Sequence, residues 1–357
     1  MTKSLLYIGT YADSKTYGIP IVEVDNETGA LALLDVVKGY HCPTYLQLNT
    51  DETKLYATAG LPSIPEPNGG LAVFRVEDKK LHFLDFGPSH CIAPCYVKVD
   101  QSSKYAYAAS YREGEGTAYQ LNSDGTFQKN QITQFVHHGQ GVHPTRQEKA
   151  HIHCTELPPD EKILYVVDLG IDTVKAYQPH PIAGKMVPIS EADLHCEAGS
   201  GPRHLRFNAN GSRGYLIHEL SSTVSVWDLE NPRAPKRLQT LSILPDFFHG
   251  ENTASAIKMS SDGTRLYCSN RGYDSIASLA IDPKSGLLTL LAISSTLGRG
   301  PRDFSILPGE KMIVVAHQYT DTLICLNINY ETGVLTPAND FLTLEQQPVC
   351  ICVGAEY

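Results

Sequence analysis

A module of about 50 residues recurs along the chain, and it constrains the fold more strongly than any other feature of the sequence. In its clearest copy, residues 201–227, a proline opens a first apolar run, a glycine-containing turn leads to a second, and a polar corner leads to a third. Short alternating apolar runs separated by such turns are typical of β-strands. No stretch keeps the spacing of an amphipathic helix for more than a turn. The module predicts an all-β fold.

Seven copies of the module can be aligned. The second run of each copy carries a tyrosine, or once a valine, at one reference position: Tyr7, Tyr56, Tyr107, Tyr165, Tyr215, Tyr267 and Val314. Thirteen residues earlier, six copies carry an anchor residue at the start of the first run: Pro43, Pro94, Ile152, Pro202, Ala254 and Pro301. A fourth run follows turns that contain Gly29, Gly286 or Gly333, because glycine supplies the positive φ of a hairpin.

The first copy has no anchor before Tyr7, but the chain ends with Pro348 and an apolar run, 47 residues after Pro301. This run supplies the missing first strand. Seven four-stranded copies predict a seven-bladed β-propeller spanning residues 1–357 as a single domain. We expect the ring to close by pairing of strand 348–353 with strand 5–8.

Composition restricts the function classes. The net charge of −10 argues against a nucleic-acid partner and against an anionic membrane surface. No apolar run reaches membrane-spanning length and the N-terminus lacks the features of a signal peptide, so we expect a cytoplasmic protein. The nine cysteines include no Cys-x-x-Cys pair, and we interpret them as reduced core residues rather than as a zinc or redox site. Oligomeric state stays open.

Ionisable residues gather at equivalent positions of the copies. First strands line the channel of a propeller and second strands run antiparallel to them, so the start of the former and the end of the latter share one channel mouth. The residues expected at that mouth include three arginines, a glutamate, a histidine and a glutamine: His153, Arg203, Arg302, Glu219, Arg271 and Gln318. Because arginine clamps carboxylates and phosphates with paired hydrogen bonds, the mouth is predicted to bind an anion.

Other polar residues have simpler interpretations. Asp172, Asp274 and Asp321 recur at one offset and are expected to cap the turn between the second and third strands. The histidines of residues 137–153 lack a carboxylate at the spacing of a catalytic metal motif, and we predict no metal and no cofactor. The two insertions, 134–150 and 60–70, are expected to be loops, where function often lies.

Several motifs together resemble a known family. They lie at residues 139–153, 167–172, 201–205, 218–224, 269–276 and 300–304. In combination they are similar to the seven-bladed lactonases, which include propeller-type 6-phosphogluconolactonases and the fungal carboxy-cis,cis-muconate cyclase. The resemblance implies that His153, Arg203, Glu219 and Arg271 are catalytic. Further substrate-binding residues are expected at Arg302, Arg146, His151, His204 and Gln318.

The leading hypothesis is hydrolysis of a small anionic lactone, with 6-phosphogluconolactone of the pentose phosphate pathway as the first candidate. Glu219 is expected to take a proton from water, and His153 is the next candidate base. Cyclisation of a carboxymuconate is an alternative within the same site. A third hypothesis comes from another class, because strands 164–167 and 224–227 also resemble the repeats of non-enzymatic propellers that dock protein partners.

Overall fold

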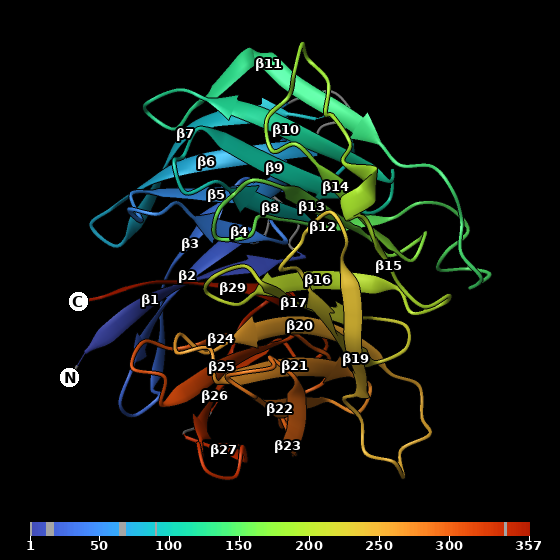
Figure 1. The fold of residues 1–357 in the computed structure, drawn as a ribbon. Helices are drawn as coiled ribbons and strands as arrows, with labels where there is room; N and C mark the ends of the chain where they lie inside the picture. Colours follow the sequence, from blue (N-terminus) through green and yellow to red (C-terminus); the bar gives the residue numbers. More distant parts are fainter. Residues whose placement is uncertain (1, 12–17, 64–68, 90, 339–340) are drawn as a thin grey trace.

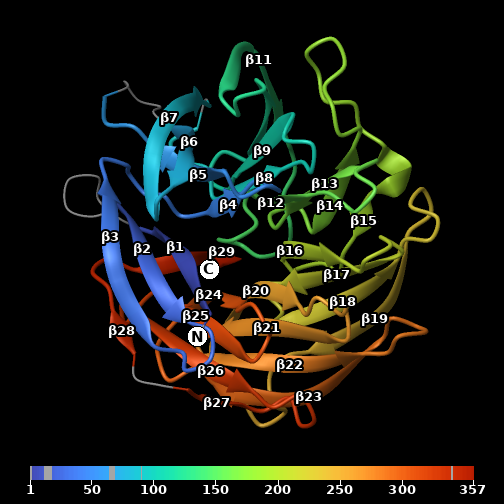
Figure 2. The same cartoon turned by 90° about the vertical axis from the view of Figure 1, so that its left-hand side faces the viewer.

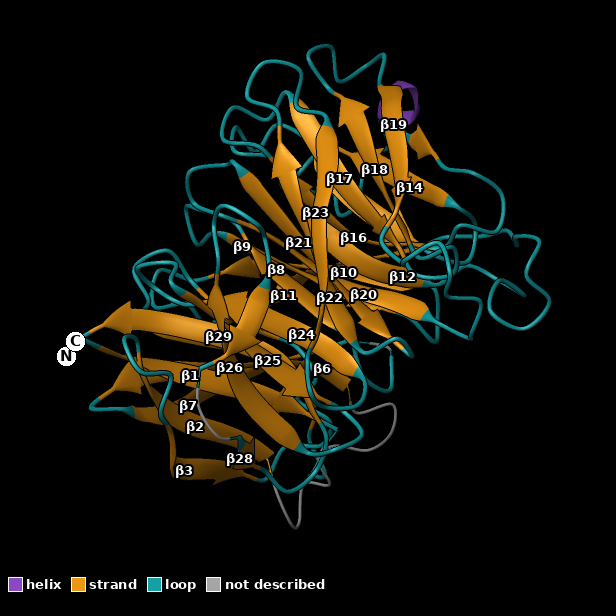
Figure 3. Ribbon diagram, turned by 90° about the horizontal axis from the view of Figure 1, so that it is seen from below, coloured by secondary structure: helices purple, strands orange, loops and turns teal. Residues whose placement is uncertain are grey.

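Seven antiparallel sheets are arranged around a common axis in the computed structural model of the chain (Figure 1). Figure 2 shows the same ring from a second side. The structure describes residues 2–11, 18–63, 69–89, 91–338 and 341–357. Strands dominate these residues, and the helix in Figure 3 is one short 3-10 turn, η1 (Ser190–Ala192). The predicted seven-bladed all-β propeller is confirmed.

The inner two strands of each blade follow the predicted order. The first strands, each in contact with the first strands of both neighbouring blades, are β29 (Pro348–Glu356), β4 (Leu46–Leu48), β8 (Tyr96–Val99), β12 (Ile152–Glu156), β16 (Pro202–Phe207), β20 (Thr253–Met259) and β24 (Pro301–Ile306). The second strands are β1 (Lys3–Thr10), β5 (Lys54–Gly60), β9 (Tyr105–Ser110), β13 (Leu164–Asp168), β17 (Arg213–His218), β21 (Arg265–Arg271) and β25 (Met312–His317). The first strands therefore line the central channel.

The outer two strands complete each sheet. The third strands are β2 (Gly18–Asp25), β6 (Gly69–Glu77), β10 (Glu115–Leu121), β14 (Thr173–Tyr177), β18 (Thr223–Asp228), β22 (Ser275–Ile281) and β26 (Thr322–Ile328). The fourth strands are β3 (Leu31–Lys38), β7 (Lys80–Pro88), β11 (Phe127–Val136), β15 (Leu194–His195), β19 (Lys236–Ser242), β23 (Leu288–Ser295) and β27 (Leu335–Pro337). A short extra strand, β28 (Leu342–Thr343), also pairs with β26.

The two ends of the chain close the ring. Strand β29 pairs antiparallel with β1, and the register places Tyr7 opposite Cys352 and Ile8 opposite Ile351. In Figure 1 the red C-terminal strand lies beside the blue N-terminal strand, and the two termini are neighbours. The predicted closure is confirmed. It removes two sheet edges that would otherwise be exposed.

The reference tyrosines pack between blades. All seven reference positions, including Val314, are at most 1% exposed. Several hydroxyls cross to the outer turn of the next blade: Tyr56 donates to the Gly125 carbonyl at 2.8 Å and Tyr215 to that of Gly286 at 3.1 Å. Both glycines have positive φ, 86° and 76°, as the turn requires. The repeated tyrosine thus joins each of these blades to its neighbour.

The recurring aspartates have a structural role, but their partners differ from the expected ones. Asp172 accepts hydrogen bonds from the backbone N–H groups of Gly199 and Gly201 at 2.7 and 2.8 Å, just before the first strand of the next blade. Asp274 accepts from the Gly300 N–H at 2.8 Å in the same way. These carboxylates therefore link blades in addition to shaping their own turns.

The loops within the two insertions are shorter than predicted, because strands extend into both insertions. Residues 134–136 belong to β11, and the loop occupies residues 137–151. Within the other insertion, residue 60 ends β5, residues 69–70 begin β6, and residues 64–68 lie outside the described residues. None of the nine cysteines, all within the described residues, forms a disulfide, but Cys42, Cys95, Cys196 and Cys352 are only partly buried and so are not the core residues that we expected. No helix in the described ranges is long and apolar enough to cross a membrane.

Candidate active site

One mouth of the channel opens into a cavity of about 450 Å³, which we call the upper cavity. It lies where first strands begin and second strands end, as the repeat alignment predicts. The predicted site residues that line it are Arg146, His153, Glu219, Arg271 and Arg302. Equivalent positions of the blades thus bring four of the nine predicted residues to one space, and the 137–151 loop adds a fifth, Arg146.

Glu219 lies at the centre of the charged groups. Its Oε2 accepts a hydrogen bond from Arg203 Nε at 2.9 Å and lies 3.0 Å from Arg271 Nη2. Its Oε1 accepts a short hydrogen bond from Arg146 Nη2. The Glu219 side chain is 4% exposed. One buried carboxylate therefore holds three guanidinium groups from three different segments.

Arg146 reaches this carboxylate from the 137–151 loop. The loop is fastened by Gln147, which is fully buried and donates from Nε2 to the Leu169 carbonyl at 2.8 Å. Its Oε1 accepts the backbone N–H of His143 at 3.0 Å. The Nε and Nη2 of Arg146 both donate to the Tyr111 hydroxyl at 3.3 Å. The inserted segment thus supplies a fixed arginine to the site.

Burial and charge set the protonation states. Burial tends to raise the pKa of Glu219, but Arg271 and Arg203 more than offset it, and the pKa lies well below its usual value. Burial, with the nearby Arg203, holds the pKa of His153 well below 6.5. Burial also lowers the pKa of Arg271 to about 10. At neutral pH the site combines an ionised glutamate, charged arginines and a neutral histidine.

Positive charge exceeds negative charge in the upper cavity. Glu219 is the one carboxylate among its described lining residues, which include four arginines: Arg112, Arg146, Arg271 and Arg302. The guanidinium of Arg302 lies 5.3 Å from the ring centroid of Tyr11, and its Nη1 is 3.5 Å from Gln318 Oε1. Arg302 thus contacts an aromatic ring and an amide, whereas Arg146, Arg203 and Arg271 contact Glu219. It is placed to receive an anionic group.

Four predicted site residues lie around the upper cavity and do not line it. Arg203 and His204 lie deeper in the channel, where Arg203 Nη1 donates to the Ser255 carbonyl at 2.9 Å. His151 is stacked on Tyr111 with ring centroids 4.3 Å apart. Gln318 contacts Arg302 from outside the lining. Each of these four side chains contacts a residue that lines the upper cavity.

Sequence reasoning missed other lining residues. Tyr11 and Tyr111 occupy the same repeat position as Glu219 and Arg271, so the alignment carried a signal for both. His41 and Arg112 lie outside the aligned positions, and no pattern in the sequence marks them. Among the described residues, no group of three His, Cys, Asp or Glu side chains is arranged to hold a metal ion.

The fold and this site define a class of protein: a seven-bladed propeller with an arginine-rich, anion-binding cavity at one mouth of its channel. The family model described as lactonase, seven-bladed β-propeller, matches residues 5–353. The chain therefore belongs to this family of lactone-hydrolysing enzymes.

Individual relatives match along almost the full length. The 6-phosphogluconolactonase of Bacillus subtilis is 33% identical over 360 residues, which cover 98% of both chains. The solved structure of the periplasmic gluconolactonase of Pseudomonas aeruginosa matches with a TM-score of 0.90 and 27% identity over 99% of both chains. A solved protein from Lactobacillus plantarum matches with a TM-score of 0.89 and 32% identity, covering 99% of this chain and 100% of that one.

Proposed function

We propose that the protein hydrolyses the lactone of a phosphorylated sugar acid, with 6-phosphogluconolactone as substrate, and so acts in the cytoplasmic pentose phosphate pathway. The observation that carries the proposal is the charge imbalance of the upper cavity, where four arginines face one carboxylate. Cations held in a partly buried space favour an anionic ligand, since such a ligand restores the electrostatic balance. A phosphoryl group supplies the charge that a plain sugar lactone lacks.

Arg302 is assigned to the phosphoryl group. The other arginines near the carboxylate are held by Glu219, whereas among the described residues the Arg302 side chain is held by Tyr11 and Gln318. A guanidinium can bind two phosphoryl oxygens at once, which fixes the orientation of the substrate as well as its affinity. The lactone ring then lies toward His153 and Glu219.

The chemical step needs a water activated beside the lactone carbonyl. The water oxygen forms a bond to the carbonyl carbon while the carbonyl oxygen gains negative charge, which Arg271 and Arg146 are placed to stabilise. The ring C–O bond then breaks, and the departing oxygen takes up the proton that the base removed from water. The product is the open-chain acid.

We assign the role of general base to His153. Glu219 stays ionised, but its two oxygens already accept bonds from three arginines, which makes it a weak base. The lowered pKa of His153 keeps the ring neutral at pH 7, and a neutral imidazole can accept a proton. Glu219 then serves to hold Arg146, Arg203 and Arg271 in place.

Assays of the purified protein against three compounds test the proposal. We expect rapid hydrolysis of 6-phosphogluconolactone, slower hydrolysis of gluconolactone and no cyclisation of carboxymuconate. Cyclisation of carboxymuconate without lactone hydrolysis would assign the site to the alternative reaction. The absence of any turnover in a folded sample would contradict both.

A further inference from the structure

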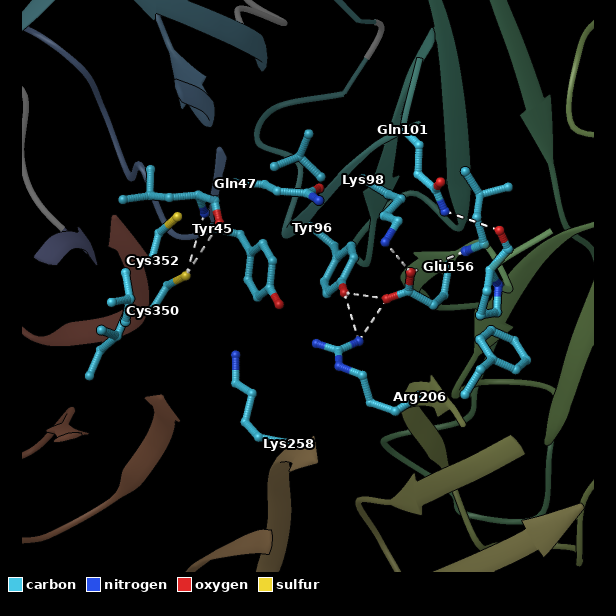
Figure 4. Close-up of a pocket in the computed structure, with 17 residues that line it drawn as sticks. Tyr45, Gln47, Tyr96, Lys98, Gln101, Glu156, Arg206, Lys258, Cys350 and Cys352 are labelled. Carbon is cyan, nitrogen blue, oxygen red and sulfur yellow. Dashed lines mark hydrogen bonds and ion pairs between the residues drawn. The ribbon is translucent and has the colours of Figure 1, made fainter. Parts of the chain in front are cut away.

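The opposite mouth of the channel contains a second cavity, of about 470 Å³, which we call the lower cavity (Figure 4). It lies near the ends of the first strands, whereas the upper cavity lies at their beginnings. Six of the seven residues found four positions after the anchors line it: Gln47, Lys98, Glu156, Arg206, Lys258 and Cys352. One ring of equivalent positions therefore supplies three cations to this mouth.

Glu156 is already neutralised by its neighbours. Its Oε1 lies 2.5 Å from Lys98 Nζ, and its Oε2 accepts hydrogen bonds from Arg206 Nη1 at 2.7 Å and from the Tyr96 hydroxyl at 3.2 Å. The side chain of Glu156 is 7% exposed. This carboxylate thus presents little negative charge to the open space.

Cationic donors remain directed into the lower cavity. The Nη1 of Arg206 makes the bonds to Glu156 and Tyr96, and in Figure 4 the second terminal nitrogen points toward the open space. Lys258 extends into the same space from β20, near the hydroxyl end of Tyr45. The Lys258 Nζ lies 3.3 Å from Asp303 Oδ1. Two cations from separate blades thus border one cavity.

The charges do not balance. Lys98, Arg206 and Lys258 carry three positive charges, and their described acidic partners, Glu156 and Asp303, carry two negative charges. All three cationic side chains are at most 22% exposed, so solvent screens them only partly. An excess of positive charge in a recessed space of a protein with net charge −10 favours an anionic ligand.

We propose that the lower cavity is a second binding site for a small oxyanion, a phosphate or carboxylate group, held between Arg206 and Lys258. Its volume lies within the roughly 300–1,000 Å³ range of small-molecule sites. The aliphatic and aromatic lining around Phe207, Ile351 and Val353 accommodates the body of such a metabolite. This proposal does not depend on the reaction assigned to the upper cavity.

Stacked rings separate the two cavities. The rings of Tyr45 and Tyr96 are stacked with centroids 4.1 Å apart, and His204 packs edge-on against Tyr96 at 5.2 Å. The ring centroid of His204 lies 5.3 Å from that of His153, which lines the upper cavity. The upper and lower cavities share no lining residue. Binding at one can therefore be measured while the other is disabled.

Protection of Lys258 from reductive methylation tests the proposal in the unmodified protein. Inorganic phosphate and gluconate serve as separate probes of the phosphate and carboxylate groups, and peptide mass spectrometry reads the modification. We expect at least one probe to slow methylation of Lys258 by about tenfold while Lys175, which is likewise paired with an aspartate, is unaffected. Protection by one probe alone identifies the group that is bound. Equal methylation rates with and without both probes would overturn the proposal.

Variants locate the protecting ligand. In Arg302→Gln, which weakens anion binding in the upper cavity, protection of Lys258 should persist. In Arg206→Gln it should be lost, whereas Lys175→Gln provides a surface control. Circular dichroism checks that Arg206→Gln is folded. If Lys258 loses its protection in Arg302→Gln but keeps it in folded Arg206→Gln, the anion lies in the upper cavity and the proposal is contradicted. If Arg206→Gln does not fold, the unmodified protein and Arg302→Gln decide the question.

Discussion

The carboxylate of Glu219 shows what one residue contributes to the site. It is buried, it is held ionised by the surrounding arginines, and it contacts Arg146, Arg203 and Arg271. The sequence alone could predict that Glu219, Arg203 and Arg271 share a mouth, because the repeat fixes their height on the axis. Arg146 was expected as a substrate-binding residue, but the repeat could not predict that it binds the same carboxylate, since the 137–151 loop has no counterpart in the other blades.

Two substitutions separate the base from the residue that positions the arginines. We expect His153→Gln to lower kcat by about 10²–10⁴-fold, the usual contribution of a general base, with little change in thermal stability. Glu219→Gln should lower kcat and also the melting temperature, because the arginines lose their shared counter-charge in a buried site. Stopped assays and thermal melts on both variants measure these effects.

The pH profiles distinguish the two roles further. The acidic limb of kcat/KM should lie well below pH 6.5 in the unmodified enzyme, because His153 is protonated by the solvent, and so lost as a base, only well below that pH. It should vanish in His153→Gln and persist in Glu219→Gln. Full kcat in His153→Gln would return the role of base to Glu219.

At the scale of elements, the blade is the repeating unit, and the contacts between blades hold the ring. Asp172 accepts hydrogen bonds from the loop that leads into β16, and these bonds fix the strand that carries Arg203. The offset of these aspartates was predictable from the repeat. Their partners were not, since those contacts join segments that are separated by almost 30 residues.

The closing strand provides a test of the ring. Deletion of residues 348–357 removes β29, with the core residue Ile351 that is only 3% exposed, and leaves the edge of β1 unpaired. We expect a large loss of stability, with a melting temperature lowered far more than by deletion of residue 357 alone, because unpaired edges and lost core contacts act together. Thermal melts of both truncations measure the difference. Equal melting temperatures would contradict the closure as the basis of stability.

At the scale of the whole molecule, four buried histidines among the described residues have pKa values lowered mainly by burial. They are His153 and His204, both far below 6.5, His218 at about 3 and His317 at about 4. The unfolded chain protonates these groups near pH 6.5 and the folded chain does not. Below pH 6.5 the unfolded state therefore binds more protons, and stability is lost as the pH falls.

Chemical unfolding at pH 7 and pH 5 checks this expectation. Each buried histidine should lower the free energy of unfolding by about 1.4 kcal/mol per pH unit below 6.5. His218→Gln should reduce this slope by the contribution of one histidine, about 1.4 kcal/mol per pH unit. Substitution of the exposed His138 should leave the slope unchanged. An unchanged slope in His218→Gln would show that this histidine is protonated in the folded state.

The architecture of the molecule follows from its period, so the seven blades and the closure could be predicted from the spacing of tyrosines and prolines. The chemistry of the two mouths depends on contacts across the channel. The alignment places Lys98, Glu156 and Arg206 at one level, but no pattern in the sequence shows that both cations meet the same carboxylate. Such contacts arise only when the ring brings distant blades together.

The preference for a phosphorylated substrate tests the central claim most directly. The measurement is the ratio of kcat/KM for 6-phosphogluconolactone to that for gluconolactone, in the unmodified enzyme and in Arg302→Gln, with the exposed Arg299→Gln as a control on the same face. A charge-assisted hydrogen bond contributes about 1.5–3 kcal/mol, so the ratio should be about 10–100 and should fall toward one in Arg302→Gln only. A ratio near one in the unmodified enzyme, or an undiminished ratio in a folded Arg302→Gln, would contradict the account.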